Sequence, residues 1–417
     1  MKLALIIDDY LPYSTRIAAK MFHDLAVYLV KEGHDVTIIT PKNDQTQSLA
    51  FDEIDGVKIW RFKSGKVKNV SKVKRAINES LLSFRAWWAI RKTVNKNSFD
   101  GVIYYSPSIF FGGIVRWLCQ RCQCHSYLVL RDLFPLWAID AGIISERSLI
   151  TSYFRFFERL SYKQAKMIGL MSDSNIKVFK NDGNSYPTEL LRNWYSLAQA
   201  HQYPIGHVPF RQRLHLQNKV IFLYGGNIGR AQDMANLMRL TKAMAKHEQA
   251  HFLYVGQGDE VDLIKSLATN WNLTNFTYLP SINQTEFKLL LSEVDIGLFS
   301  LSADHTSHNV PGKLLGYMAQ QIPILGSVNK GNDLMELVNH NNAGIIRVNG
   351  DDSSLYQAAK MLLEEPQLRE MLGKGAYKLL QQKFSVATAA RTILHHLYPS
   401  KKTILDREYT KKTSLKY

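Results

Sequence analysis

Apolar and polar residues alternate along the first forty residues in a pattern that predicts a strand, a helix and a second strand. The apolar run at 3–7 indicates a buried strand, the helical spacing of apolar residues at 17–31 indicates an amphipathic helix, and the run at 35–40 indicates another strand. Gly33 follows the helix, a common position for glycine at a helix end. Two strands joined by a helix in this way form a parallel βαβ unit.

Strands and helices continue to alternate in two series. Further strands are predicted at 101–106, 125–130 and 167–172 in the first series, and at 220–226, 251–259, 276–281, 294–300, 322–327 and 344–348 in the second. A loose segment with Pro204 and Pro209 separates the two series. The pattern predicts an α/β protein made of two Rossmann-like, doubly wound domains facing across a cleft.

The domain boundaries expected from this pattern divide the chain into five parts. They are an amino-terminal domain at 1–196, a linker at 197–218, a carboxyl-terminal domain at 219–382, a helix at 383–399 that returns to the first domain, and a mobile basic tail at 400–417. Folds of this class bind ligands in the loops at the carboxyl ends of their strands, so the chemistry is expected in those loops.

The composition is typical of a folded protein in a reducing compartment. Of the 417 residues, 46% are apolar and 21% are charged. All three cysteines lie within 119–124, which excludes a disulfide framework and predicts a cytoplasmic location. The first apolar run is short and is followed by Asp8 and Asp9, which favours a strand over a signal peptide. No apolar run approaches the ~20 residues of a membrane span.

The stretch from Cys119 to His125 contains three thiols and an imidazole, so it could in principle bind a metal ion. Structural zinc sites place their ligands on a turn that folds around the ion. These residues instead span a predicted helix end and a strand start, which favours ordinary reduced thiols. Asp8 and Asp9 are adjacent rather than spaced as an Asp-x-Asp pair, so no metal site is predicted there either.

Positive charge is concentrated in the first half of the chain. The net charge is +16, and residues 1–200 hold 28 Lys and Arg against 18 Asp and Glu. In the segment 63–97 basic residues are interleaved with aromatic ones, a pattern that fits a helix lying in the headgroup layer of an anionic membrane. The residues expected to contact the membrane are Lys66, Lys68, Lys72, Lys74, Trp87 and Trp88. In the alternative interpretation the tryptophans pack in the core and the lysines form a solvated face.

Three loops after strands of the second series are candidates for anion binding: YGGNIGRAQ (224–232), VGQGDE (255–260) and NVPGK (309–313). Such loops present free backbone N–H groups, and arginine or lysine adds positive charge. The candidate residues are Gly225, Gly226, Asn227, Arg230, Gly256, Gly258, Asn309, Pro311, Gly312, Lys313 and Leu314. None of these loops has the spacing of a dinucleotide fingerprint or a P-loop.

These motifs and their spacing resemble the donor half of family 4 glycosyltransferases. The segments YLPSINQTEFKLLLSEVDIGLFS (278–300) and LVNHNNAGIIRVNGDD (337–352) extend the resemblance, and the first series adds the acceptor-side segments YLPYSTRIAAKMFHDLAVYLVKEGHDVTIITP (10–41), LVLRDLFPLWAIDAGII (128–144) and LRNWYS (191–196). Within the family the chain most resembles the WbuB-like L-fucosamine transferases of O-antigen biosynthesis. The resemblance implies a GT-B fold with an acceptor-side first domain and a nucleotide-sugar donor domain, metal-independent chemistry and retention of the anomeric configuration.

The resemblance also implies roles for individual residues. Arg230 and Lys313 would neutralise the departing diphosphate together with helix-entrance N–H groups. Arg131 and Asp132 match the acceptor side, where Asp132 would orient or deprotonate the acceptor hydroxyl; the alternative is an ion pair that caps the next helix. The loop Ser14, Thr15 and Arg16 corresponds to the family's loop near the donor phosphates.

The chain departs from the family pattern where two glutamates usually stand eight positions apart. His308 and Gly316 occupy those positions, and the second glutamate normally grips the nucleotide ribose. Tyr317 and Asn309 are the candidates to replace that contact. The lysine that usually follows Arg230 is also missing, so Lys313 is expected to carry more of the phosphate charge.

The sequence therefore predicts a glycosyltransferase without cofactor or metal. The expected reaction moves a sugar, specifically N-acetyl-L-fucosamine, from a UDP-linked donor to a polyprenyl-diphosphate-linked saccharide in O-antigen or lipopolysaccharide biosynthesis, at the inner face of the cytoplasmic membrane. One alternative is a UDP-sugar epimerase of the same fold, which would need no membrane segment and more carboxylates. Another is a basic nucleic-acid-binding protein, although the chain contains no recognisable module of that kind.

Overall fold

The computed structural model describes residues 1–14, 16–66, 71–140, 142–196, 206, 208–303 and 311–398, with only the backbone at 72–74 and 284. The chain forms two compact units. The first contains Met1–Arg192 and the chain from Val386 onward, and the second is Asn193–Ser385. The chain thus passes between the units at 192/193 and at 385/386, a few residues from the expected boundaries at 196 and 382. The expected tail at 400–417 lies outside the described residues.

The described residues of the first unit contain one sheet of eight strands, in the order β3-β4-β2-β1-β5-β6-β7-β8. The strands are β1 (Lys2–Ile6), β2 (Asp35–Lys42), β3 (Leu49–Ile54), β4 (Val57–Lys63), β5 (Gly101–Ser106), β6 (His125–Leu130), β7 (Met167–Leu170) and β8 (Thr188–Leu190). All neighbours pair in parallel except β3 and β4, which form an antiparallel hairpin at the edge. This hairpin was not among the predicted strands.

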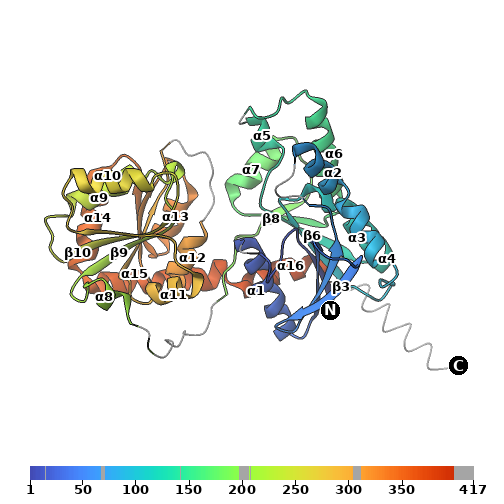
Figure 1. Ribbon diagram of the computed structural model, residues 1–417, viewed down its shortest axis with the longest axis horizontal. Coiled ribbons are helices and arrows are strands. Elements are labelled where there is room, and N and C mark those ends of the chain that lie inside the picture. Colours follow the sequence, from blue (N-terminus) through green and yellow to red (C-terminus); the bar gives the residue numbers. More distant parts are fainter. Residues whose placement is uncertain are drawn as a thin grey trace. The chain divides into compact units, whose positions relative to one another are not determined.

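Helices cover both faces of the first sheet (Figure 1). They are α1 (Ile17–Lys31), α2 (Lys72–Ser80), α3 (Leu82–Ile90), η1 (Ile109–Phe111), α4 (Gly112–Cys122), α5 (Leu136–Asp140), α6 (Leu149–Gln164), α7 (Asp173–Asn181) and α16 (Val386–Leu397). Helix α4 packs between α3 and α6 on one side of the sheet, and α1 packs against α16. No helix in the described ranges is both long and apolar enough to cross a bilayer.

Helix α16 is anchored to the first sheet by a hydrogen-bonded network. The Tyr127 hydroxyl on β6 donates to Glu189 on β8 (2.7 Å), and the second carboxylate oxygen of Glu189 lies 3.0 Å from His396 Nε2. Ala389, Ile393 and other apolar residues of the helix are buried. The carboxyl-terminal helix therefore packs in the first unit although the residues before it lie in the second.

The second unit has a fully parallel sheet, described with six strands in the order β11-β10-β9-β12-β13-β14. The strands are β9 (Val220–Asn227), β10 (Ala250–Gln257), β11 (Phe276–Leu279), β12 (Ile296–Ser300), β13 (Ile324–Val328) and β14 (Gly344–Val348). The helices are α8 (Phe210–Arg213), η2 (Arg230–Gln232), α9 (Met234–Ala243), α10 (Val261–Asn270), α11 (Gln284–Leu291), α12 (Gly312–Ala319), α13 (Asp333–His340), α14 (Asp352–Glu364), α15 (Pro366–Leu379) and η3 (Leu380–Phe384).

Alternate residues of these strands enter two separate apolar clusters, one on each face of the second sheet. On β9, Ile221 and Leu223 pack with α11, α12, α13 and α15, whereas Phe222 and Tyr224 pack with α9, α10 and α14. A parallel sheet buried on both faces leaves only its strand ends available for a ligand.

The second half of the expected linker at 197–218 belongs to the second unit, which corrects that prediction. The backbone N–H groups of Phe210 and Arg211 donate to the Glu293 carboxylate at 3.0 and 2.8 Å, and the Arg211 guanidinium pairs with Asp295 at 2.6 Å. Phe210 is buried in the core. These contacts hold α8 against the second unit, although the prolines and polar residues of the segment 197–218 suggest a free linker.

Candidate functional site

The first two glycine-rich loops lie side by side at the carboxyl edge of the second sheet. Strand β9 pairs with β10 as far as Gly226 opposite Gly256 and Asn227 opposite Gln257. A Cβ atom on Gly256 would lie 1.8 Å from the carbonyl oxygen of Gly226, and one on Gly258 would lie 2.0 Å from that of Ile228. Gly256 and Gly258 are therefore required by the close approach of the neighbouring backbone, whether or not a ligand is bound.

Lys313, in the first turn of α12, is buried at this edge. Its Nζ lies 3.8 Å from the centre of the Tyr224 ring, and no described residue forms a hydrogen bond with it. A Cβ atom on Gly226 would come within 3.4 Å of Lys313 Cε and Nζ, so a side chain there would crowd the amine. Burial lowers the pKa of Lys313 to about 7.

Lys313 is the second residue of α12 and so belongs to the amino terminus of that helix. Pro311 stands before the helix and offers no side-chain cap, and Gly312 is exposed. The first N–H groups of a helix have no intrahelical acceptor and attract an anion. Leu314 differs from the prediction: its side chain is fully buried in the core and its N–H donates to Pro311 at 3.1 Å. It is therefore not placed to bind a donor.

The loop after β9 carries Asn227 and Arg230 in exposed positions. The Arg230 side chain is 89% exposed, and its Nε lies 3.8 Å from the Asp259 carboxylate. Asn227 donates its side-chain N–H to Gln232 at 2.8 Å. Exposed ion pairs of this length contribute little to stability, so the Arg230 guanidinium can turn toward an anionic ligand at little cost.

Tyr317 is not available as a ribose contact, which corrects that expectation. The side chain is fully buried. Its hydroxyl accepts from the Gly225 N–H at 3.2 Å and lies 3.1 and 3.4 Å from the carbonyl oxygens of Leu223 and Leu298. Tyr317 thus fastens β9 to β12 beneath the glycine loop. Asn309 and His308 lie outside the described residues.

Gly316, which the resemblance aligns with a ribose-binding glutamate, lies within α12. A Cβ atom there would lie 3.4 Å from Leu291 Cδ1, and nothing else is within 4 Å. Space and backbone conformation would therefore admit a methyl group at this buried position.

A buried polar cluster that the sequence analysis missed supports the same edge. Asn236 on α9 donates to the hydroxyl oxygens of Ser300 (3.1 Å) and Ser327 (2.6 Å). Ser300 is the last residue of β12, and Ser327 is the last but one of β13. Asn349, just after β14, donates to Asp233 at 2.9 Å. These contacts fix the start of α9 against three strand ends. Polar residues directly after apolar runs were the available sequence signal.

In the first unit, Arg131 joins three strand ends. Its guanidinium donates to the carbonyl oxygens of Leu130 (3.2 Å), Gly169 (3.2 Å) and Arg192 (3.3 Å). Leu130 ends β6, Gly169 is the last but one residue of β7, and Arg192 follows β8. Burial lowers the pKa of Arg131 to about 10. These three hydrogen bonds to the backbone give Arg131 a structural role.

Asp132 and residues of the loop after β1 act electrostatically on a tyrosine that the sequence analysis did not select. Burial raises the pKa of Tyr105 to about 12, and the charges of Arg131, Asp8, Asp132 and Arg16 act on this pKa more weakly. Burial also raises the pKa of Asp132, and a hydrogen bond from Trp137 partly offsets this shift.

Arg16 is held by the acids at the end of β1. Its guanidinium lies 3.3 Å from the Asp8 carboxylate and 3.6 Å from that of Asp9. The Arg16 N–H donates to the Ser14 hydroxyl at 3.2 Å, and Thr15 lies outside the described residues. The loop after β1 thus brings together Arg16 and the two acids.

The two tryptophans of the basic segment face different surroundings. Trp88 is exposed and stacks on Phe84, whereas Trp87 packs against the core and lies 5.8 Å from the Trp117 ring. Lys66 is exposed. Lys68 lies outside the described residues, and Lys72 and Lys74 are described only as part of the α2 backbone.

The cysteine stretch contains free thiols. Cys119 and Cys122 lie on α4, and Cys124 precedes β6. Its thiol hydrogen-bonds both others, and these contacts raise the pKa of Cys124. In the described ranges no group of three or more His, Cys, Asp or Glu residues is placed to hold a metal ion.

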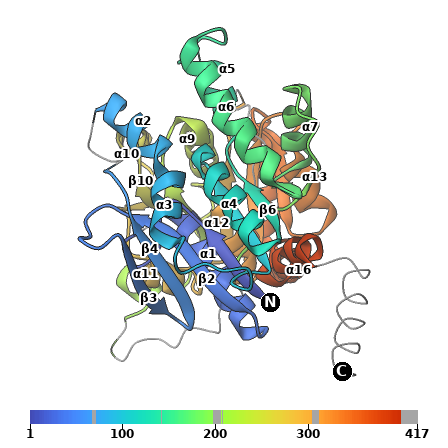
Figure 2. The ribbon, with the colours of Figure 1, turned by 90° about the vertical axis from the view of Figure 1, so that its right-hand side faces the viewer.

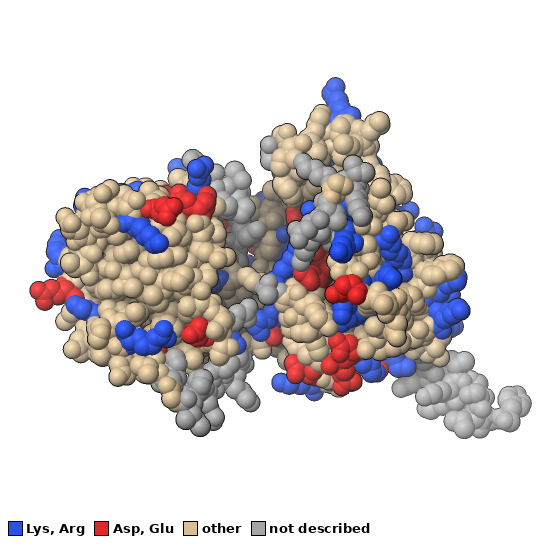
Figure 3. Space-filling model, in the orientation of Figure 1, with Lys and Arg blue, Asp and Glu red and all other residues tan. Residues whose placement is uncertain are grey.

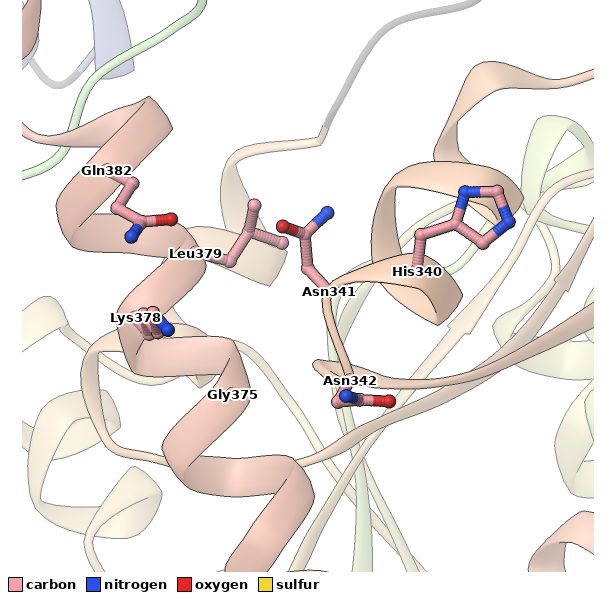
Figure 4. Close-up of a pocket in the computed structure, with 7 residues that line it drawn as sticks. All are labelled: His340, Asn341, Asn342, Gly375, Lys378, Leu379 and Gln382. Carbon is pink, nitrogen blue, oxygen red and sulfur yellow. The ribbon is translucent and has the colours of Figure 1, made fainter.

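A cavity of about 240 Å³ lies at the opposite edge of the second sheet from Lys313, where β14 begins (Figure 4). Figure 4 shows Lys378, Leu379 and Gln382 on one helical element facing the turn before β14. The lining residues are His340, Asn341, Asn342, Gly375, Lys378, Leu379 and Gln382. None of them was a predicted site residue.

Solved structures with the same architecture identify the class of fold. Sucrose-phosphate synthase from Thermosynechococcus elongatus has a TM-score of 0.64 at 16% identity, covering 99% of both chains. Anabaena HepE in complex with UDP and glucose has a TM-score of 0.64 at 16% identity, covering 95% of this chain and 99% of its own. WaaG, a glycosyltransferase of lipopolysaccharide biosynthesis, has a TM-score of 0.59 at 14% identity over 94% and 99%. The fold is GT-B, as predicted.

The second unit resembles a known family. Residues 210–379 match the family model described as glycosyl transferases group 1. The probable glycosyltransferase WbjE of Pseudomonas aeruginosa is 26% identical over 220 residues, which span 52% of this chain and 54% of that protein. WcaI of Escherichia coli, a putative colanic acid biosynthesis glycosyl transferase, is 22% identical over 333 residues, spanning 76% and 81%.

Proposed function

We propose that the chain is a metal-independent, retaining glycosyltransferase that moves a sugar from a UDP-linked donor to a lipid-linked saccharide. The observation that carries the proposal is the buried Lys313 amine at the start of α12, which no described residue satisfies. A buried cation without a partner is costly, whereas one that meets an anionic ligand is stabilised. The UDP-bound HepE structure, which shares the fold, supports a nucleotide diphosphate as that ligand.

The donor edge has the means to stabilise a diphosphate leaving group. Negative charge grows on the leaving oxygen as the sugar–phosphate bond breaks. In our proposal Lys313 and the first N–H groups of α12 receive that charge, and Arg230 turns from Asp259 to add a second cation. Gly226 leaves the amine uncrowded, and Gly225 stays in place through its bond to Tyr317.

The acceptor side offers one carboxylate with a shifted pKa. Burial raises the pKa of Asp132, which makes it a better proton acceptor at neutral pH than an ordinary aspartate. We assign it the task of orienting or deprotonating the acceptor hydroxyl.

The specific reaction we propose is transfer of N-acetyl-L-fucosamine to an N-acetylhexosamine carried on polyprenyl diphosphate, by a protein bound peripherally at the inner face of the cytoplasmic membrane. The names of WcaI and WaaG, which refer to colanic acid and lipopolysaccharide biosynthesis, support a surface-polysaccharide pathway. The exposed Trp88 and Phe84 beside basic residues support the membrane location.

The test is release of UDP from a panel of UDP-sugars, with and without a lipid-linked N-acetylglucosamine, in the presence of a chelator. We expect acceptor-dependent release with one donor, unchanged by the chelator and lost in Lys313→Met. An epimerised sugar formed without acceptor would identify the epimerase alternative, and a strict requirement for a divalent ion would contradict the proposed chemistry.

A further inference from the structure

Helix α6 exposes an apolar stripe along its amino-terminal half. Leu149 is 89% exposed and Phe156 62%, and Ile150 and Tyr153 are also exposed. The spacing of 149, 153 and 156 places these side chains on one face of the helix. A helix on the surface of a globular protein normally packs its apolar face against the core. An exposed apolar stripe therefore indicates a binding surface.

A second exposed stripe runs along α2 and α3. Ile77, Leu81, Phe84 and Trp88 follow one another at helical spacing, and all four are exposed. The Phe84 and Trp88 rings stack at 6.0 Å, and the Arg91 guanidinium lies 3.5 Å from the centre of the Trp88 ring. The aromatic side chains therefore form an ordered apolar surface with a basic edge.

The two stripes lie next to each other. The Tyr153 hydroxyl on α6 hydrogen-bonds the Ser80 hydroxyl at the end of α2. Helices α3 and α6 also both contact α4 and η1, and Figure 2 shows α3, α4 and α6 side by side. We call this combined surface the two-helix face. It consists of Ile77, Leu81, Phe84, Trp88, Leu149, Ile150, Tyr153 and Phe156.

Charges beside the two-helix face are mainly basic. Arg85 lies on α3 and Arg91 directly follows it. Arg147 precedes α6 and Arg159 lies on α6. Two acids lie nearby: Glu79, which is paired with Arg75 at 2.9 Å, and the exposed Glu146, which is next to Arg147. Figure 3 shows, on the side in view, a largely uncharged upper end of this unit with lysines and arginines along its edge. Apolar rings flanked by arginine match an anionic bilayer, in which rings enter the headgroup layer and guanidinium groups meet phosphates.

We infer that α6 is a second membrane-contacting helix and that the two-helix face, rather than the basic segment 63–97 alone, docks the protein on an anionic phospholipid bilayer. This inference rests on the membrane location in the proposed function. Ring contacts connect the face to α5, which follows the loop that carries Asp132: Tyr153 packs on Phe154, Phe154 on Phe134, and Phe134 on Trp137.

The test is sedimentation of the full chain with vesicles of phosphatidylglycerol and phosphatidylcholine. We compare Leu149→Ser/Phe156→Ser on α6, Phe84→Ser/Trp88→Ser on α3, and the control Leu263→Ser/Met371→Ser, which removes exposed apolar residues of the second unit. Both face variants should lose at least about tenfold in vesicle binding, and the control none. Unchanged thermal unfolding and UDP affinity would establish that the variants fold.

Wild-type binding by the α6 variant, with loss only in the α3 variant, would overturn the inference while leaving the proposed membrane location intact. If the wild type does not bind vesicles but forms dimers that the α6 variant does not form, the face is a self-association surface and the inference is wrong. Vesicle binding and UDP-sugar turnover are measured separately. Vesicle binding without turnover of any UDP-sugar would therefore contradict the proposed function and leave this inference intact.

Discussion

Two buried cations, one in each unit, stand at comparable places in their sheets but have opposite surroundings. Arg131 follows β6 and donates to three backbone carbonyl oxygens. Lys313 enters the edge of the second sheet from α12, and no described group accepts a hydrogen bond from its amine. Burial lowers the pKa of both residues, to about 10 for Arg131 and about 7 for Lys313.

The difference separates a structural cation from a binding one. The terminal nitrogens of Arg131 donate to backbone oxygens at three strand ends, so this guanidinium holds strands together. The Lys313 amine has only the Tyr224 ring beside it, and a buried amine without an acceptor lowers the stability of the protein until an anion binds. The comparison therefore gives Arg131 contacts that stabilise the fold and supports the proposed donor-binding role of Lys313, although the sequence analysis counted both as site residues.

The largest effect is expected from Lys313→Met. Removing one charge-stabilising donor from a transition state typically lowers turnover by about 100-fold or more. We expect that loss in acceptor-dependent UDP release, together with an unfolding free energy that is unchanged or raised by about 1–3 kcal/mol, because an unsatisfied buried amine is removed. A variant that retained wild-type turnover would remove the distinction between the two cations.

Arg131→Met should have the reverse outcome. Loss of the charged hydrogen bonds to Leu130, Gly169 and Arg192 should lower the unfolding free energy by about 2 kcal/mol, measured by denaturant titration. UDP affinity should stay unchanged, because the second unit carries that site. Asp132→Asn is the matched control: it should fold like the wild type and lose transfer activity. Normal stability in the arginine variant would contradict its structural role.

The pH dependence of UDP affinity should follow the Lys313 amine. Burial lowers the pKa of Lys313 to about 7 in the free protein, and a bound diphosphate raises the pKa again because it supplies the opposite charge. Above pH 7 binding must therefore add a proton, so affinity should fall as pH rises, by up to about tenfold per unit. Calorimetric titrations between about pH 7 and pH 9 measure this slope. Lys313→Met should show none.

The smallest effect is expected at Gly316. Alanine is favoured over glycine in a helix by about 1 kcal/mol, and an added Cβ atom would meet only Leu291 Cδ1, at an ordinary contact distance of 3.4 Å. Gly316→Ala should therefore raise the unfolding free energy by about 1 kcal/mol and leave UDP affinity unchanged. Destabilisation, or weaker UDP binding, would show that the bare helix position serves the nucleotide after all.

Much of the fold could be predicted because its apolar runs are clear. The bounds of α1, β5, β6 and β14 agree with the sequence pattern. The β3–β4 hairpin was missed although its turn signal is present: Asp55 and Gly56 both have positive φ (52° and 77°), and an Asp-Gly turn between alternating residues predicts a hairpin.

The candidate site was predictable as motifs but not as contacts. The sequence shows that Lys313 follows Pro311 and Gly312 at a helix start, yet burial without a partner depends on how α12 meets β9. The helical pattern likewise cannot show that the Tyr317 hydroxyl points to Gly225, nor that Arg131 reaches carbonyl oxygens 38 and 61 residues away along the chain. Such side-chain directions are set by tertiary packing.

The number of protons taken up when UDP binds at pH 8 tests the role of Lys313 most directly. Calorimetric titrations in two buffers of different ionisation enthalpy give this number. The wild type should take up roughly 0.9 proton, since an amine with a pKa near 7 is mostly neutral at that pH and becomes charged beside the diphosphate. Lys313→Met should take up none. Binding of UDP by the wild type without proton uptake, or equal uptake by the variant, would contradict the assignment of Lys313 as the buried cation that receives the donor diphosphate.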